Sequence, residues 1–226
     1  MIQKKSVAIF DFCETLVDLQ SADEFVLFVH HNNQLPILNQ RLFACWKWAR
    51  KFRFLAIYDR IFRNNPIEKK WLLYSLKGLT ESFIIQQATQ FSEWLKTRIN
   101  ENVWSQFELT TKYSDIVIIC SGGYEVYLDA FFSEFNVQII ATRIKFKNGK
   151  FTGRMDGLDC LKEEKVKRIE KYYGNDFWSI VNIEFYSDSI TDLPLFEKSK
   201  RKIVAYKNKP PVWANADKFE TLKWKN

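Results

Sequence analysis

The chain has 226 residues, enough for one sizeable core or for a core domain plus a smaller second domain. Apolar residues make up 46%, which argues against intrinsic disorder. The net charge of +7 suits anionic partners such as phosphates, acidic lipid surfaces or nucleic acid, and it identifies none of them.

The cysteines and the N-terminus bear on where the protein works. Four widely spaced cysteines form no CxxC pair, which is typical of the reducing cytoplasm. The apolar run in MIQKKSVAIFDF is too short for a signal peptide. No segment approaches the roughly 20 apolar residues that a membrane helix needs. We therefore predict a cytoplasmic protein.

In chain order, the first predicted element is a buried strand over residues 7–12, which is short, apolar and bounded by charge. From residue 21 to residue 105, apolar residues recur at helical spacing. This region predicts an all-helical insert, with breaks near Pro36, Asn64 to Pro66, and Gly78.

Strand patterns return after the insert. The expected elements are a strand over 116–120, a helix that follows Ser121-Gly122-Gly123 and runs through 135, a strand over 137–144, a type I′ hairpin turn at Asn148-Gly149, a basic helix over 161–173, a strand over 180–186 and a last strand over 202–206. Alternating strands and helices predict an α/β fold, with a Rossmann-like parallel sheet between two layers of helices.

These elements predict two domains and one site. The core domain comprises 1–20 and 106–226, and the helical domain comprises 21–105. Ligands of parallel sheets bind beyond the carboxyl ends of the strands. Three of those ends carry polar residues, namely Asp11, Ser121 and Asp188. We expect these three side chains to form one site.

Four blocks of sequence follow one another across residues 8–197: AIFDFCETLV, IICSGG, CLKEEKVKRIEKYYG and FYSDSITDLPLFE. They resemble the four motifs of the haloacid dehalogenase (HAD) superfamily, in the branch that includes phosphoserine phosphatase. The first motif of that family is usually DxDxT and the fourth is usually GDSxxDLP. The helical insert lies between the first and second blocks, where this branch keeps its cap.

The resemblance implies a phosphatase in which Asp11 attacks phosphorus and forms an aspartyl-phosphate, which divides one difficult displacement into two easier ones. Asp11, Asp188 and the backbone carbonyl of Cys13 would hold Mg²⁺, a hard ion that prefers oxygen ligands. Ser121 and the Gly122 N–H would bind phosphoryl oxygens.

The resemblance also implies two supporting residues. Lys165 would neutralise the nucleophile and the phosphate, with Lys162 as a nearby competitor for this role. Asp192 would orient the metal shell and hold Lys165. Each residue alone has an ordinary explanation, such as a helix cap or a surface lysine, so the prediction rests on the joint pattern.

Cys13 is the main departure from the family pattern, because the family's phosphatases have an aspartate there. That aspartate protonates the leaving alcohol and then activates water, and such acid–base help contributes typically about 10²–10⁴-fold. The metal role of this position uses the backbone carbonyl. Binding of Mg²⁺ and phosphate should therefore persist while turnover is in question.

Three interpretations of Cys13 stay open. The enzyme works slowly or on a good leaving group, with the thiol, Glu14, Asp23 or Glu24 as the acid. The chemistry differs, as in HAD branches that lack the aspartate. The chain binds phosphorylated ligands without turnover, with Cys13 as a small buried apolar residue. We favour the first, because the other site residues are in workable form.

Gln20 is the second departure. The family's phosphoserine phosphatases have a glutamate at this position, and it reads the substrate's amine. The resemblance therefore favours a sugar, polyol or lipid-headgroup phosphate over an amino-acid phosphate.

Residues 41–63 combine seven Arg or Lys with interleaved aromatic residues and one acid. We interpret them as an amphipathic cap helix with a solvated basic face. A second interpretation is peripheral contact with an anionic membrane at its inner face. The motif blocks also resemble phosphatidylglycerophosphate phosphatases of this branch, whose caps are more continuously hydrophobic. Nucleic-acid binding ranks third, because no RNA- or DNA-binding motif is present.

Overall fold

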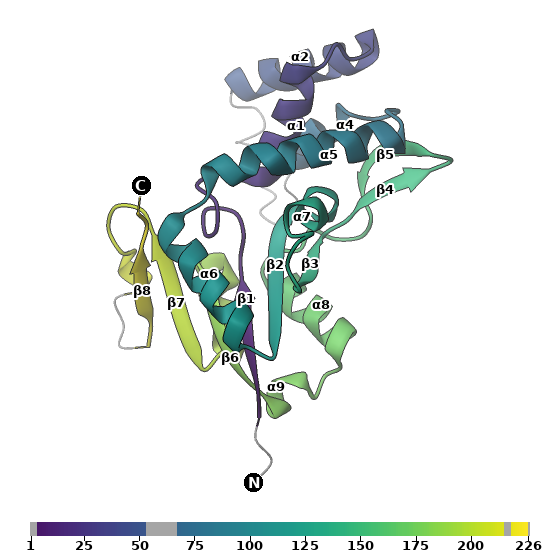
Figure 1. Ribbon diagram of the computed structural model, residues 1–226. Helices are drawn as coiled ribbons and strands as arrows, with labels where there is room; N and C mark the ends of the chain where they lie inside the picture. Colours follow the sequence, from purple (N-terminus) through teal and green to yellow (C-terminus); the bar gives the residue numbers. More distant parts are fainter. Residues whose placement is uncertain (1–3, 53–66, 215–217, 226) are drawn as a thin grey trace.

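A six-stranded sheet forms the centre of the computed structural model, which describes residues 4–52, 67–214 and 218–225 (Figure 1). Its strand order is β3-β2-β1-β6-β7-β8 and every pairing is parallel. The strands are β1 (Lys5–Phe10), β2 (Ile116–Tyr124), β3 (Gln138–Thr142), β6 (Val181–Ser187), β7 (Arg201–Tyr206) and β8 (Glu220–Lys223). The predicted α/β fold with a parallel sheet is confirmed.

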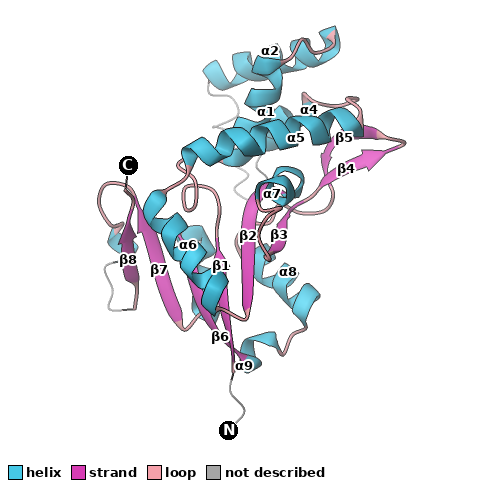
Figure 2. Cartoon of the chain, viewed as in Figure 1, coloured by secondary structure: helices cyan, strands magenta, loops and turns pink. Residues whose placement is uncertain are grey.

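Helices cover both faces of this sheet (Figure 2). Val7 and Ile9 of β1 belong to one buried cluster, and Ala8 and Phe10 to another, because alternate residues of a strand point to opposite faces. The cluster of Ala8 and Phe10 includes residues of α6 (Glu101–Tyr113) and α7 (Glu125–Phe131). The cluster of Val7 and Ile9 includes residues of α8 (Glu163–Tyr173), α9 (Phe177–Ile180) and α10 (Leu193–Lys198).

The helical insert lies beyond the carboxyl ends of the strands (Figure 1). Its described helices are α1 (Ser21–Asn32), α2 (Ile37–Lys51), α4 (Ile67–Tyr74) and α5 (Glu81–Leu95). Pro36 immediately precedes α2, and Gly78, with φ +86°, separates α4 from α5, as predicted. The break predicted at Asn64 to Pro66 lies outside the described residues.

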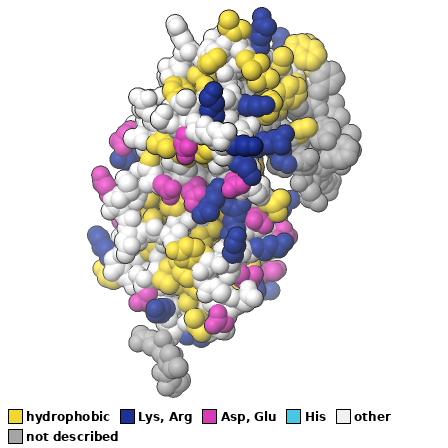
Figure 3. Space-filling model, turned by 90° about the vertical axis from the view of Figure 1, so that its right-hand side faces the viewer, with side chains coloured by type: hydrophobic (Ala, Val, Ile, Leu, Met, Phe, Trp, Pro, Cys, Tyr) yellow, Lys and Arg dark blue, Asp and Glu magenta, His cyan; other side chains and the backbone are white. Residues whose placement is uncertain are grey.

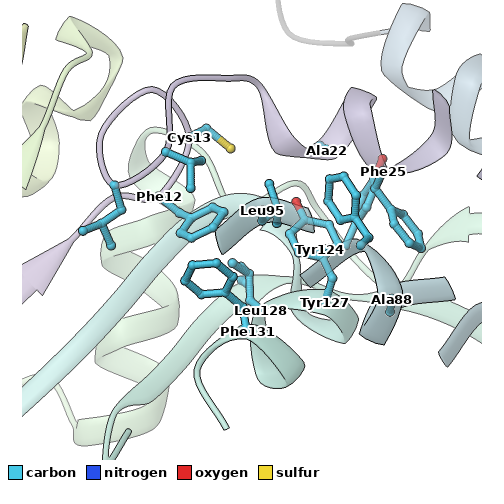
Figure 4. Packing of buried hydrophobic residues seen from close by; sticks show 14 of the residues in the cluster. Phe12, Cys13, Ala22, Phe25, Ala88, Leu95, Tyr124, Tyr127, Leu128 and Phe131 are labelled. Carbon is cyan, nitrogen blue, oxygen red and sulfur yellow. The ribbon is translucent and has the colours of Figure 1, made fainter. Parts of the chain in front are cut away.

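Aromatic side chains join the insert to the core (Figure 4). The ring of Phe25 in α1 lies 5.4 Å from that of Tyr127 in α7, and the ring of Phe91 in α5 lies 5.1 Å from it. All three side chains are fully buried. This dry contact holds the insert against the helix that follows β2, and it includes favourable edge-to-face geometry.

A β-hairpin from the second half of the chain also packs on the insert. Strands β4 (Ile144–Lys147) and β5 (Lys150–Met155) are joined by Asn148 and Gly149, whose φ angles of 52° and 68° confirm the type I′ turn. Phe151 N donates to Leu79 O and Gly78 N donates to Phe151 O, both at 2.8 Å. The insert is therefore hydrogen-bonded to a segment that follows β3.

Several predicted elements differ in the structure. The first strand, predicted over 7–12, is β1 (Lys5–Phe10), and the helix predicted through 135 ends at Phe131. The single strand over 137–144 divides after Thr142, where the chain leaves the sheet and enters β4. The helix expected from residue 161 begins at Glu163. The strand over 202–206 is not the last, because β8 extends the sheet beyond it. The residues of β8 are mostly exposed, so no apolar run marks this edge strand in the sequence.

Two further predictions concern the domain boundary at residue 105 and membrane-spanning helices. Helix α6 spans residue 105, the predicted division, and packs against β2 and β8. Among the described residues, no helix is long and apolar enough to cross a membrane.

A half-buried histidine makes the insert sensitive to acid. The His30 ring stacks on Phe43 with centroids 3.9 Å apart, and its Nε2 lies 2.7 Å from Ser75 Oγ. Burial, with help from His31 and Lys47, lowers the pKa of His30 to about 4. An unfolded histidine takes up its proton near pH 6.5, so the unfolded chain binds more protons between these pH values.

We therefore expect the free energy of unfolding to fall by about 1–2 kcal/mol as the pH drops from about 6.5 to about 4 through this group, a range reduced for partial exposure. Thermal unfolding at pH 7 and pH 5 measures the loss. His30→Gln should shrink it, whereas His31→Gln, at an exposed neighbour, should retain most of it. An equal loss in wild type and His30→Gln contradicts the assignment.

Candidate active site

Three neighbouring strands bring the first site residues together. Asp11 follows β1, Ser121 lies near the end of β2, and Asp188 follows β6. These strands are adjacent in the order β2-β1-β6 and run parallel, so their carboxyl ends share one edge of the sheet. Asp11 N donates to Tyr186 O at 2.9 Å, which extends the pairing up to the site.

A buried lysine lies between two carboxylates at this edge. Lys165 Nζ donates to Asp11 Oδ1 and to Asp192 Oδ2, each at 2.7 Å, and its side chain is 1% exposed. Burial acts to lower the pKa of Lys165, but Asp11 and Asp192 hold it well above its ordinary value. Lys162, the alternative lysine, is exposed before α8. The structure thus brings Lys165, and not Lys162, to Asp11.

Asp192 is held from a second side. Ser187 Oγ donates to Asp192 Oδ2 at 2.7 Å. The other oxygen, Oδ1, is buried and has no hydrogen-bond partner in the described part of the chain. A buried carboxylate oxygen without a partner is costly, so this atom indicates a missing polar group at the site.

The Asp11 and Asp188 carboxyl groups share one hydroxyl. Thr15 Oγ1 lies 3.2 Å from Asp188 Oδ1 and 3.4 Å from Asp11 Oδ2, and it accepts from Asp188 N at 3.0 Å. Burial raises the pKa of Asp11 to about 6, although Lys165 opposes the shift. Burial, Asp11 and Glu14 raise the pKa of Asp188 to about 7. The site therefore has more negative charge than Lys165 can balance.

This donor set fits Mg²⁺. A hard divalent cation takes oxygen ligands from one or two carboxylates and keeps several waters. Asp11 and Asp188 supply such oxygens, and the orphaned Asp192 Oδ1 suits a metal-bound water. The described residues contain no cluster of three or more His, Cys, Asp or Glu side chains in metal-binding geometry. A site of two carboxylates and a backbone carbonyl needs no such cluster.

The Cys13 thiol lies beside the site in a chain of hydroxyl groups. Its Sγ is 3.0 Å from Ser21 Oγ, which is 2.6 Å from Tyr127 Oη, and it is 3.8 Å from Ser121 Oγ. Figure 4 shows Sγ directed toward the start of α1. Burial and the Asp11 carboxylate raise the pKa of Cys13. The group is therefore a neutral thiol at neutral pH.

The loop after Ser121 has a bulged backbone. The register between β2 and β3 shifts between Ser121 and Tyr124, and bulges are common beside active sites. A Cβ on Gly122 would lie 2.6 Å from Leu161 Cδ2, so a larger residue here would have to displace the Leu161 side chain. Gly123 N donates to Ser121 Oγ at 3.1 Å, which holds the serine hydroxyl at the strand end.

A cavity of about 290 Å³ opens between these groups and the insert. Asp11, Cys13, Gly122, Lys165, Asp188 and Asp192 line it from the core, and Ala22, Asp23, Glu68 and Lys69 line it from the insert. Gln20 also lines it and donates to Glu14. Burial raises the pKa of Asp23. The insert thus lines the cavity with two carboxyl groups, Asp23 and Glu68, and one ammonium group, Lys69.

Several residues that shape this site were not predicted from the sequence. Thr15 had a signal, because it is the threonine of the DxDxT pattern. Ser21 and Tyr127, which continue the hydrogen bonding from Cys13, had none. Nor did Lys69 and Asp159, which form a partly buried ion pair of 2.7 Å between the insert and the core.

Comparisons with known proteins indicate a family. The sequence model of the haloacid dehalogenase-like hydrolase family matches residues 8–197. A phosphoserine phosphatase of Methanocaldococcus jannaschii is 24% identical over 96% of this chain and 92% of its own length. A probable phosphatase of Mycobacterium tuberculosis is 30% identical over 83 residues, which are 37% of this chain and only 29% of that relative.

Solved structures share the fold. A Bordetella pertussis protein of unknown function has a TM-score of 0.77 at 18% identity, over 97% of this chain and 99% of that chain. An apo phosphoserine phosphatase has a TM-score of 0.60 at 19% identity, over 96% and 94%. Since the family model covers most of the sequence, the chain belongs to the haloacid dehalogenase-like hydrolase family, as the four motif blocks predict.

Proposed function

We propose that the chain is a Mg²⁺-dependent phosphomonoester hydrolase that acts through an aspartyl-phosphate on Asp11. One observation carries the proposal: a single buried ammonium, Lys165, contacts both Asp11 and Asp192 at the strand edge that also holds Ser121 and Asp188. An ion pair buried this deeply costs free energy unless the charges are well paired, which is typical of a functional site.

The residues divide the work of phosphoryl transfer. Asp11 Oδ2, the oxygen not bonded to Lys165, is the nucleophilic atom. The Lys165 ammonium balances the charge of the nucleophile and the incoming phosphate. Ser121 Oγ and Gly122 N–H donate to phosphoryl oxygens, which stabilises the charge that spreads over them in the transition state.

Asp11, Asp188 and the carbonyl of Cys13 would hold Mg²⁺. The ion supplies positive charge that lets a dianionic phosphate approach a carboxylate. Asp192 keeps Lys165 in place and leaves Oδ1 for a water in the metal shell. Thr15 fixes the two ligand carboxyl groups relative to each other.

Cys13 sets the limit on turnover. A thiol whose pKa is raised stays protonated at neutral pH, so it does not act as a base for water, and it is a weaker general acid than the carboxylic acid it replaces. Glu14 and Asp23 also line the cavity and are the remaining candidate acids. The alternative is a weakly catalytic protein that binds phosphorylated ligands.

The cavity wall bears on the substrate. We propose that the insert, residues 21–105 in the sequence-based division, acts as a cap that excludes water and selects the leaving group. The Gln20 amide donates a hydrogen bond to Glu14, and the Asp23 carboxyl group lines the cavity. Carboxylate and amide oxygens suit hydroxyl groups, which supports a sugar, polyol or lipid-headgroup phosphate.

Helix α2 supports peripheral contact with an anionic membrane as a second candidate property. Residues Ile37–Lys51 include four Arg or Lys and no acid. Its exposed apolar residues include Ile37, 70% exposed, Leu38, 62%, and Trp48, 59%. Figure 3 shows basic and hydrophobic side chains close together on this part of the surface. Residues 53–63 of the basic segment lie outside the described residues.

Restoring an aspartate at position 13 should distinguish a hydrolase that lacks a good acid from a protein that binds phosphorylated ligands with little turnover. In a Mg²⁺-dependent phosphate-release assay, we expect wild type to hydrolyse an aryl phosphate faster than alkyl phosphates, because an aryl leaving group needs little protonation. Cys13→Asp should raise alkyl turnover by about 10²–10⁴-fold. The alkyl panel comprises sugar, polyol, amino-acid and lipid-headgroup phosphates.

Two variants control this experiment. Asp11→Asn gives the blank, and Cys13→Ser keeps a small hydrogen-bonding group without adding a carboxylate. Alkyl turnover by wild type above the blank establishes the enzyme directly. No release by wild type or by folded Cys13→Asp would refute the hydrolase proposal.

Metal binding should be visible without catalysis. Asp188→Asn removes one of two adjacent buried carboxylates, so we expect the metal-free variant to melt at a higher temperature than metal-free wild type. Mg²⁺ should raise the melting temperature of wild type and have little effect on Asp188→Asn. Asp23→Asn, which removes an acid from the opposite wall, should keep the Mg²⁺ response. An undiminished response in Asp188→Asn would exclude this ligand.

Membrane contact predicts co-sedimentation with anionic vesicles and not with zwitterionic ones. Replacing Arg41, Lys47 and Lys51 by Gln should abolish it, since each basic residue near the surface contributes about 1 kcal/mol. The matched control replaces three exposed lysines of the core, Lys167, Lys171 and Lys200. Equal binding by both triple variants would show that net charge alone, and not α2, is responsible.

A further inference from the structure

A lysine of the insert contacts the core beside the loop of Ser121, Gly122 and Gly123. Lys69, on α4, places Nζ at 2.8 Å and 2.7 Å from the two carboxyl oxygens of Asp159, and at 2.8 Å from the carbonyl oxygen of Gly122. Asp159 lies in the loop before α8 and accepts a further hydrogen bond from Thr142 Oγ1 at 2.6 Å. The Lys69 side chain is 14% exposed, so this contact is largely shielded from water.

The Gly122 carbonyl belongs to the same peptide unit as the Gly123 N–H. The carbonyl accepts from Lys69, and the N–H donates to Ser121 Oγ at 3.1 Å. Hydrogen bonds in such a chain polarise one another, and a charged donor strengthens the next bond. One peptide therefore connects the Lys69 ammonium to the Ser121 hydroxyl.

This connection limits the directions open to the hydroxyl hydrogen. Ser121 Oγ accepts from Gly123 N at 3.1 Å and lies 3.8 Å from Cys13 Sγ, so its hydrogen can be donated to that sulfur or to an outside acceptor such as a phosphoryl oxygen. Leu161 also packs on Gly122, where a side chain would otherwise lie. Leu161 and Lys69 thus hold the loop at Gly122, one by packing and one by charge.

We propose that Lys69 is a positioning residue for oxyanion binding. It fixes the Gly122–Gly123 peptide so that Ser121 donates to a phosphoryl oxygen, and it does so only while the insert is docked on the core. Docking of the insert and affinity for phosphate are thereby coupled. The inference rests on the proposed function, because it takes Ser121 as a phosphate ligand.

A double-mutant cycle tests the coupling. The probe is orthovanadate, a phosphate analogue, titrated by calorimetry in the presence of Mg²⁺, and the variants are Lys69→Met, Ser121→Ala and their combination. We expect Lys69→Met to weaken binding about tenfold in the wild-type background and less than twofold in the Ser121→Ala background. Equal losses in the two backgrounds overturn the proposal, because Lys69 would then act independently of Ser121.

Two further variants keep the outcome interpretable. Lys69→Met leaves the partly buried Asp159 without its cation, so Lys69→Met with Asp159→Asn should recover thermal stability while affinity stays low. Recovery of affinity as well overturns the proposal. Lys77→Met, at an exposed lysine of the insert that bonds only Tyr74 Oη in the described structure, should bind like wild type. Binding that is indifferent to Ser121→Ala refutes the phosphate role of Ser121 and this inference together.

Discussion

The site depends on one buried ammonium. Lys165 comes from the start of α8, far along the chain from Asp11, yet its Nζ lies midway in a bridge between Asp11 and Asp192. Removing Lys165 would leave two buried carboxylates without their cation, so the three groups hold β1, α8 and the segment before α10 in one arrangement. The remaining imbalance, with Asp188 added, is what makes the site suited to a cation and then to a phosphate.

Much of this could be read from local sequence. Apolar runs that end in Asp11, Ser121 and Asp188 identify strands and their polar ends without any long-range knowledge, because strand burial and the parallel sheet follow from short-range patterns. Asn148 and Gly149 likewise predict their turn, since both positions need a left-handed backbone. Only Asp11, Ser121 and Asp188 could be predicted from strand ends, whereas Lys165 and Asp192 were predicted from the resemblance to the family motifs.

The rest depends on contacts that no local pattern encodes. Lys69 is one lysine among many until α4 is placed over Asp159, and the Cys13 environment is formed by Ser21 and Tyr127, which belong to different elements. Strand β8 lacks an apolar run because it lies at an exposed edge. In each instance the tertiary arrangement, and not the residue's own neighbourhood, gives the residue its role.

The hairpin changes how the insert can move. The chain passes between sheet and insert near residues 16–20 and 96–100, and the pairing of β5 with the segment before α5 adds passages at Arg143 and after Met155. The first two passages are themselves tied by Asn100 N to Leu16 O at 2.9 Å. An insert hinged at four places is stiffer than one hinged at two. Such added connections restrict how far the insert can swing away from the cavity.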